Sequence, residues 1–172
     1  MIMKLENEIK IEQVERMEGH LEEFSELLKH VVDGGASIGF LRPLDLSVSK
    51  SYWENVLTPD VILFAAKINH RIVGTAQLHL CTKENGKHRA EVVKVMTHPS
   101  YQKKGIGRAL MQMVEQRAKQ EGRSLLILDT REGDPSNHLY TSMGYIQAGR
   151  ISGYTKAENG KSEATILYYK EL

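Results

Sequence analysis

The first half of the chain combines two kinds of hydrophobic periodicity. Residues 8–14 (EIKIEQV) alternate polar and apolar side chains, which predicts a strand. Residues 17–32 place apolar side chains at helical spacing and are followed by two glycines, so we expect a helix there. Residues 34–48 are punctuated by glycine and proline and are expected to be irregular. A second short helix is expected over residues 49–57, with Ser49 as its cap.

The middle of the chain predicts three consecutive strands. Residues 61–68 and 71–80 flank an Asn69-His70 turn, which is typical of a β-hairpin. A polar turn follows, and residues 90–97 predict the third strand. An antiparallel meander is therefore expected at the centre of the fold.

The C-terminal half predicts a helical crossover. Residues 106–121 carry apolar side chains on one helical face and charges on the other. Residues 124–130 are apolar throughout their middle, as in a strand covered on both faces. A short helix over residues 135–142 and strands over residues 145–151 and 163–170 complete the chain.

This order of elements predicts one α/β domain over residues 1–172, with a mixed, mostly antiparallel sheet flanked by helices. The helical crossover makes the third strand of the meander parallel to the strand that follows the helix. We expect these two strands to part near Met96 and Asp129, because a bulge at residues 95–97 would interrupt their regular pairing.

Composition and charge exclude several classes of protein. Hydrophobic residues make up 41% of the 172 residues and charged residues 26%, which is ordinary for a globular protein. The formal net charge of +1 creates no general attraction for nucleic acid or membranes, so neither is expected as a partner. Cys81 is the only cysteine, which excludes an intrachain disulfide and a cysteine-ligated zinc site, and no metal is expected. The first six residues lack a signal-peptide core, so we expect a cytoplasmic protein.

Residues 102–108 (QKKGIGR) have the features of a phosphate-binding loop. They follow a predicted strand and open a predicted helix, whose first N–H groups are unpaired and lie at the positive end of the helix dipole. Gly105 and Gly107 remove side chains that would keep a phosphate away from those N–H groups. The basic side chains of the loop are Lys103, Lys104 and Arg108.

Three known phosphate-binding patterns are candidates for this loop. The P-loop pattern is absent, and the Rossmann pattern requires a small residue where Leu110 stands. The spacing of Gln102, Gly105 and Gly107 fits the third pattern, Gln/Arg-x-x-Gly-x-Gly/Ala, and residues 92–111 as a whole resemble the strand, loop and helix of the GNAT acetyltransferase superfamily.

That resemblance implies acetyl-coenzyme A as co-substrate. In the superfamily this loop holds the coenzyme A pyrophosphate, and the pantetheine arm pairs with the backbone at the end of the preceding strand. The cofactor contacts implied for this chain are Val95, Met96, Thr97, Gln102, Lys103, Lys104, Gly105, Ile106, Gly107 and Arg108.

Residues 139–145 (LYTSMGY) resemble a second superfamily motif. The resemblance implies that Tyr140 protonates the departing coenzyme A thiolate, and a phenol with a pKa near 10 is protonated at neutral pH. Many members have an asparagine seven residues before this tyrosine. Here Gly133 stands at that position, and Asn137 is the remaining candidate for that cofactor contact.

Two carboxylates compete for the role of general base. Glu91 precedes Gln102 by eleven residues, the spacing of the base in the histone-acetylating branch that this segment resembles. Asp129 ends an apolar strand, and ligands collect at the carboxyl ends of parallel strands. His79 and His98 rank below both, and nothing in the sequence activates Cys81 as a nucleophile, so direct transfer in a ternary complex is expected.

A narrower resemblance concerns the acceptor. Residues 34–40, 89–98 and 125–140 and the C-terminal strands look like the GNAT subgroup that includes tabtoxin-resistance enzymes, which acetylate the amine of a small amino-acid toxin. It implies an N-acetyltransferase for a small-molecule amine, with a role in toxin or antibiotic resistance. A protein or peptide N-acetyltransferase and an acyl-coenzyme A-binding regulatory module are the alternatives, and a homodimer is left open.

Two segments are candidates for the acceptor side of the site. Residues 34–48 contain three glycines, which suit either a substrate lid or an ordinary loop. The turn at residues 131–137 is the other candidate. Asp45 and Glu132 are candidates for holding a cationic amine.

Overall fold

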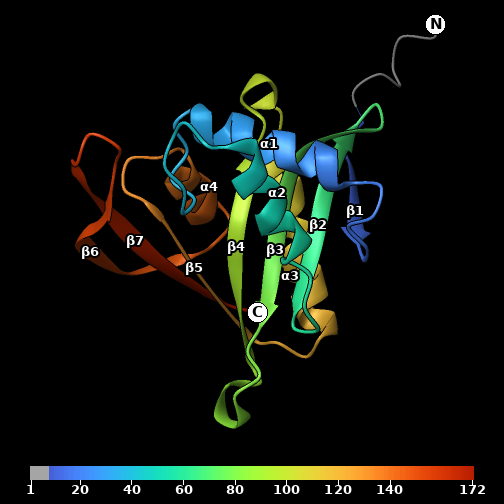
Figure 1. The fold of residues 1–172 in the computed structure, drawn as a ribbon. Coiled ribbons are helices and arrows are strands. Elements are labelled where there is room, and N and C mark those ends of the chain that lie inside the picture. Colours follow the sequence, from blue (N-terminus) through green and yellow to red (C-terminus); the bar gives the residue numbers. More distant parts are fainter. Residues whose placement is uncertain (1–7) are drawn as a thin grey trace, which may run out of the picture.

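A computed structural model describes residues 8–172 and shows one seven-stranded sheet with helices on both faces (Figure 1). The spatial order of the strands is β1-β2-β3-β4-β5-β7-β6. The strands are β1 (Lys10–Val14), β2 (Val61–Ile68), β3 (Arg71–Leu80), β4 (Arg89–Thr97), β5 (Leu125–Arg131), β6 (Ile146–Lys156) and β7 (Ser162–Glu171). The helices are α1 (Leu21–Asp33), α2 (Leu46–Glu54), α3 (Ile106–Gln120) and α4 (Ser136–Ser142). Residues 1–7, where the sequence shows no signal-peptide core, lie outside the described part.

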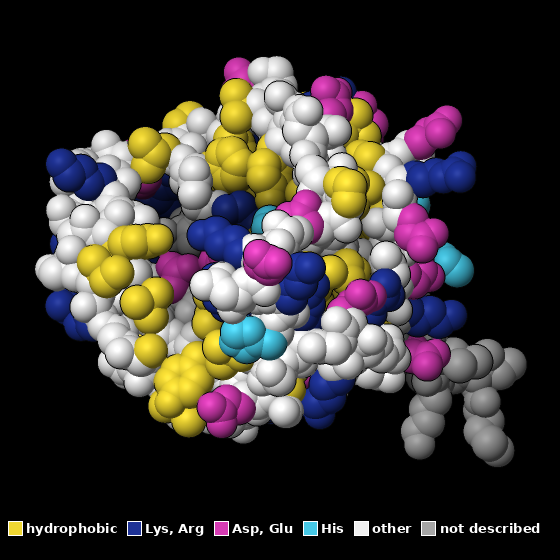
Figure 2. All heavy atoms as spheres, turned by 90° about the horizontal axis from the view of Figure 1, so that it is seen from below, with side chains coloured by type: hydrophobic (Ala, Val, Ile, Leu, Met, Phe, Trp, Pro, Cys, Tyr) yellow, Lys and Arg dark blue, Asp and Glu magenta, His cyan; other side chains and the backbone are white. Residues whose placement is uncertain are grey.

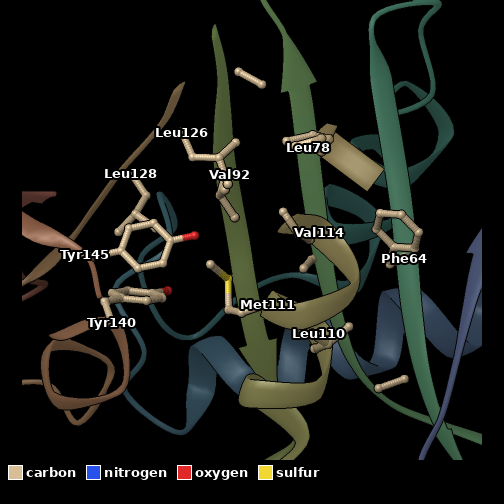
Figure 3. Close-up of a cluster of buried hydrophobic side chains, with 14 of the residues drawn as sticks. Phe64, Leu78, Val92, Leu110, Met111, Val114, Leu126, Leu128, Tyr140 and Tyr145 are labelled. Atoms are coloured by element: carbon tan, nitrogen blue, oxygen red, sulfur yellow. The ribbon is translucent and has the colours of Figure 1, made fainter. Parts of the chain in front are cut away.

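The predicted fold class is confirmed. Every neighbouring pair of strands is antiparallel except β4 and β5, which are parallel on either side of the α3 crossover. Helices α1 and α2 cover one face of the sheet and α3 covers the other, so the core consists of two layers of side chains (Figure 1). The layer beneath α3 is shown in Figure 3, where Leu110 and Val114 from the helix pack against strand residues such as Leu78.

Local sequence explains the hairpin and the seat of α3. Asn69 and His70 both have positive φ, 50° and 65°, as a tight hairpin turn requires. Gly74 in β3 lies under α3, where a Cβ would come within 2.9 Å of the Met96 carbonyl oxygen and of Ile106. The glycine therefore permits the close approach that brings the start of α3 to the end of β4.

The predicted start of the second helix was wrong. Asp45, rather than Ser49, caps α2 by accepting a hydrogen bond from the Ser47 N–H (2.8 Å). Ser49 is fully buried inside the helix, and its hydroxyl donates to the Ser25 carbonyl oxygen of α1 (2.7 Å). The polar side chain that the sequence offered as a cap thus connects the two helices instead.

Strands β4 and β5 separate earlier than predicted. Their pairing ends at Glu91 and Ile127 instead of near Met96 and Asp129. The bulge also lies slightly earlier than expected, because Lys94 and Val95 together face the single β3 residue between Thr75 and Gln77. Beyond Glu91, β4 pairs with no other strand of residues 8–172 on its β5 side, and its edge borders the cavities described below.

Charged side chains of both signs are mixed on the face of the molecule seen in Figure 2. No helix within residues 8–172 has the length and apolar character needed to cross a membrane. The same residues contain no group of three or more His, Cys, Asp or Glu side chains arranged to hold a metal ion. The charges that bear on function are those that line the cavities.

Candidate active site

Two cavities open where β4 and β5 part. The first, with a volume of about 510 Å³, is lined by the 102–108 loop, the end of β4 and the start of α4, and we call it the loop cavity. The second, of about 370 Å³, contains Glu91 and Asp129, and we call it the carboxylate cavity. Tyr140 lines both, as does Val95 in the β4 bulge. The two cavities therefore meet at the separated edges of the parallel strands.

The loop cavity includes the backbone at the start of α3. Lys103 and Gly105 have positive φ (62° and 83°), which turns the chain sharply into α3. The first helical hydrogen bond runs from the Ala109 N–H to the Gly105 carbonyl oxygen, so the N–H groups of residues 106–108 precede it. A Cβ at Gly107 would lie 3.2 Å from the Leu139 side chain of α4. Free N–H groups at a helix start suit a phosphate.

Most of the predicted cofactor contacts line this cavity. Those that do are Val95, Met96, Thr97, Gln102, Lys103, Gly105, Ile106, Gly107 and Arg108. Lys104 and Asn137 are not among the lining residues of either cavity. The Asn137 amide instead donates to the carbonyl oxygens of Arg131 and Asp134 and accepts from the Tyr168 hydroxyl (2.8 Å). Its contact with a cofactor stays a prediction, whereas its support of the turn before α4 is visible.

Tyr140 presents a buried phenol to both cavities. Its side chain is 4% exposed and packs near the rings of Tyr145 and Tyr168 (Figure 3). Within residues 8–172 its hydroxyl has no hydrogen-bond partner. Burial, and secondarily the charge of Asp129, raise the pKa of Tyr140 well above its usual value. The phenol is therefore held protonated, as a proton donor must be.

Glu91 and Asp129 face the second cavity from the two separated strands. Glu91 pairs with Ile127, and Asp129 lies two residues further along β5, so both carboxylates are on the same face of the sheet. Asp129 accepts a hydrogen bond from the Thr165 hydroxyl (2.8 Å). Partial burial and the nearby charge of Asp129 raise the pKa of Glu91, while Lys94 lowers it. A raised pKa makes Glu91 a stronger base, and Asp129 remains the second candidate.

Residues 25–145 match the acetyltransferase (GNAT) family. The chain belongs to this family and is an acyltransferase. It is also 28% identical, over 129 residues, to an uncharacterized N-acetyltransferase from the hisH–hisA intergenic region of Azospirillum brasilense, an alignment that covers 73% of this chain and 77% of that protein.

Solved acetyltransferase structures share this fold. A ribosomal-protein-alanine N-acetyltransferase from Brucella melitensis has a TM-score of 0.79 at 20% identity, covering 94% of this chain and 99% of that one. YncA of Salmonella typhimurium, solved with acetyl-coenzyme A, has a TM-score of 0.79 at 18% identity, covering 96% and 95%. A structure titled as a putative phosphinothricin N-acetyltransferase has a TM-score of 0.80 at 17% identity, covering 95% and 99%. At such identities the likeness concerns the fold.

The histidines of this GNAT chain lie outside both cavities. Nε2 of His79 is hydrogen-bonded to Oε1 of the buried Gln77 (2.8 Å), and Gln77 donates to the Tyr52 hydroxyl of α2. His98 accepts a hydrogen bond from the Ser100 N–H in the turn after β4. Both side chains thus have structural partners, in keeping with their lower rank as bases.

The two acidic residues considered for amine binding also have structural roles. Asp45 caps α2. Glu132 is ion-paired with Arg150 of β6. Neither lines the loop cavity or the carboxylate cavity, whose acidic lining residues are Glu91, Asp129 and Asp134.

The segment between α1 and α2 forms a wall of the site. Its first residues, 34–38, border one or both cavities. It is anchored to the far half of the sheet, since Arg131 donates to the Gly35 carbonyl oxygen (3.0 Å) and Arg42 pairs with Glu158. Leu44 is buried at its other end. Because these contacts hold the segment in place, they fit a fixed wall better than a mobile lid.

Several cavity residues were missed by sequence reasoning. Tyr101 lines the loop cavity, and Lys94, Tyr154 and Thr165 line the carboxylate cavity. Tyr101 directly precedes the glycine loop, so the loop motif could have indicated it as a cavity residue. Tyr154 and Thr165 lie on β6 and β7, and only the tertiary fold brings them to Asp129.

Proposed function

We propose that this protein transfers the acetyl group of acetyl-coenzyme A directly to a primary amine of a small molecule, within a ternary complex. The observation that carries the proposal is the position of Tyr140, where the loop cavity meets a cavity with two carboxylates. Such an arrangement supplies a donor for the leaving group between the two substrates and a base on the acceptor side.

The loop cavity fits the co-substrate. The N–H groups of residues 106–108 and the cationic side chains of Lys103 and Arg108 suit a pyrophosphate. The edge of β4 beyond Glu91 has no strand partner on its β5 side, so its backbone groups are available to an extended pantetheine arm. In the proposed complex the thioester would lie near Tyr140, and these features support that arrangement.

The proposed reaction has two proton transfers. The acceptor amine reacts in its neutral form. Its nitrogen attacks the thioester carbonyl carbon, and Glu91, or alternatively Asp129, takes the proton that the nitrogen loses. The tetrahedral intermediate collapses by breaking its carbon–sulfur bond. Tyr140 gives its proton to the departing thiolate, and the products are the acetylated amine and free coenzyme A.

The shape of the carboxylate cavity supports a small acceptor. Residues 36–39 cover it from one side, while β4, β5 and residues of β6 and β7 form its other walls. A peptide acceptor would require an open trough instead. The resemblance to the tabtoxin-resistance subgroup supports the same choice. We also propose that the protein is a single acetyltransferase domain that acts in the cytoplasm. Its proposed role is resistance to a toxin or an antibiotic.

A screen of acceptors with acetyl-coenzyme A tests the proposal. Release of the thiol would be followed across simple amines, amino acids, aminoglycosides and peptides, and the acetylated product identified by mass spectrometry. We expect turnover with small amines and none with peptides. Turnover confined to peptides would favour the protein-modifying alternative. Tight binding of acetyl-coenzyme A without turnover on any acceptor would favour a regulatory module.

A further inference from the structure

Lys94 occupies an unusual backbone position in the β4 bulge. Its φ is 54°, in the left-handed region that a lysine rarely adopts. Regular alternation along β4 would point its side chain to the sheet face opposite Glu91. The bulge instead brings Nζ to the segment that walls the carboxylate cavity, 5.9 Å from the centre of the Phe40 ring. A strained position of this kind is a reason to look for function.

A glycine makes room for this ammonium group. Gly39 has a φ of 94°, and a Cβ placed there would lie 3.2 Å from Nζ of Lys94. A side chain at residue 39 would therefore crowd the lysine as well as strain the backbone. The glycine at residue 39 thus leaves space for the Lys94 ammonium at the wall of the carboxylate cavity.

The two cations of the carboxylate cavity differ in their partners. Arg131 is fully engaged, since it pairs with Asp134 and Glu163 and donates to the Gly35 carbonyl oxygen. The Lys94 ammonium makes a cation–π contact with the Phe40 ring, and it has neither a hydrogen bond nor an ion pair to any of residues 8–172. A half-buried cation without an anionic or hydrogen-bonding partner is costly. Arg131 thus supports the wall, and the Lys94 ammonium has no anionic partner within the described residues.

Two carboxylates act on Lys94 from a distance. Burial lowers the pKa of Lys94, and the charges of Asp129 and Glu91 offset part of that effect. Both carboxylates lie beyond ion-pair distance of Nζ. The cavity therefore presents a positive group and two negative groups that do not pair with one another.

We propose that Lys94 binds a carboxylate of the acceptor, so that the preferred acceptor is an amino-acid-like zwitterion whose amine faces Glu91 and Asp129. The inference rests on the proposed acetyl transfer and adds the class of acceptor and the residue that selects it. Opposite charges on one small molecule complement the separated charges of the cavity. A carboxylate would also supply the anionic partner that the Lys94 ammonium lacks within residues 8–172.

Matched acceptors isolate this interaction. Free L-amino acids would be compared with their own carboxamides, which keep the amine and side chain but lose the negative charge. Amidation lowers the pKa of the amine, so rates would be expressed per neutral amine. We expect the wild-type protein to prefer the acids in kcat/KM by at least about tenfold, the effect of one good charge pair.

Variants of Lys94 then assign the preference. Lys94→Met should bring the acid-to-amide ratio close to one, mainly through a higher KM for the acids, while Lys94→Arg should keep a preference for acids. Any effect of the lost charge on Glu91 acts on acids and amides alike and cancels in the ratio. Lys83→Met, at an exposed lysine away from both cavities, should behave as wild type.

The possible failures are distinguishable. Equal use of acids and amides by the wild-type protein, or an acid preference that survives Lys94→Met, would overturn the role of Lys94 and leave the proposed acetyl transfer intact. An absence of turnover with every amine, in protein that binds acetyl-coenzyme A by calorimetry, would overturn both proposals.

Discussion

The loop cavity and the carboxylate cavity share Tyr140 but present different chemical groups. The first offers backbone N–H groups from the start of α3 and an unpaired strand edge, with basic side chains around its rim. The second offers side chains, with Glu91, Asp129 and Lys94 at its walls. Backbone groups recognise whatever phosphate or amide is common to all ligands, whereas side chains distinguish one ligand from another.

This difference suggests a division of labour. Backbone N–H groups are lost only through substitutions that block them, so this part of the loop cavity requires the glycine loop. A site made of side chains changes its preference with single substitutions. Within one GNAT domain, the co-substrate would therefore be fixed by the loop cavity and the acceptor chosen by the carboxylate cavity.

The largest expected effect comes from blocking the loop cavity. Gly107→Glu adds bulk beside Leu139 and a negative charge where the pyrophosphate is proposed to bind. We expect binding of acetyl-coenzyme A to fall below detection by calorimetry. Gly107→Ala is the matched control, because its Cβ meets only a side chain at 3.2 Å and should weaken binding much less. Unchanged affinity in Gly107→Glu would remove the loop from the site.

The next effect separates the two candidate bases. Glu91→Gln should leave affinity for acetyl-coenzyme A unchanged and lower turnover by about 10²–10⁴-fold, the usual range for loss of a general base. Asp129→Asn should cost less, because the Asp129 carboxylate acts on Glu91 and Tyr140 through its charge. The reverse order, measured by kcat/KM at several pH values, would assign the base to Asp129.

Removal of the proton donor should have a smaller but still large effect. Tyr140→Phe keeps the packed ring and deletes a hydroxyl that has no partner within residues 8–172, so fold and cofactor affinity should be preserved. We expect the single-turnover rate to fall by roughly 10²-fold. Product release does not mask the chemical step in that measurement. A full rate would mean that water protonates the thiolate.

The smallest effect concerns pH. Lys94 lowers the pKa of Glu91, because its positive charge favours the carboxylate form. Lys94→Met removes that charge, so the pKa of Glu91 should rise and the acidic limb of the pH–kcat/KM profile should move to higher pH. The profile would be measured with a carboxamide acceptor, to separate this effect from acceptor binding. A shift to lower pH would contradict the arrangement of charges described here.

The same division explains how much of the site was predictable from sequence. Half of the residues that line the loop cavity lie within residues 92–111, a continuous segment that carries the glycine motif, and the rest come from the end of α1, the segment after it and residues 131–140. The carboxylate cavity collects residues from β4, β5, β6, β7 and the segment after α1, and no local pattern relates them. Glu91 and Asp129 were within reach because both lie on the parallel pair, whereas the role of Lys94 depends on a bulge that sequence placed one residue too late.

The fold itself was more accessible than its details. Alternating patterns predicted the meander and the crossover, because the burial of a strand or helix face leaves a regular trace in the sequence. The start of α2 was missed because Asp45 and Ser49 are both good caps. Only the contact of Ser49 with Ser25, across 24 residues of sequence, decides between them.

The short pairing between β4 and β5 joins two halves of the sheet. Three residue pairs connect these two strands, against seven between β5 and β7, so the connection between the halves is narrow. Arg131 and Arg42 also attach the segment after α1 to the half of the sheet that contains β5, β7 and β6. A substrate that contacts both halves would stabilise their arrangement, and a molecule that binds between the halves and separates them would inhibit the protein without resembling either substrate.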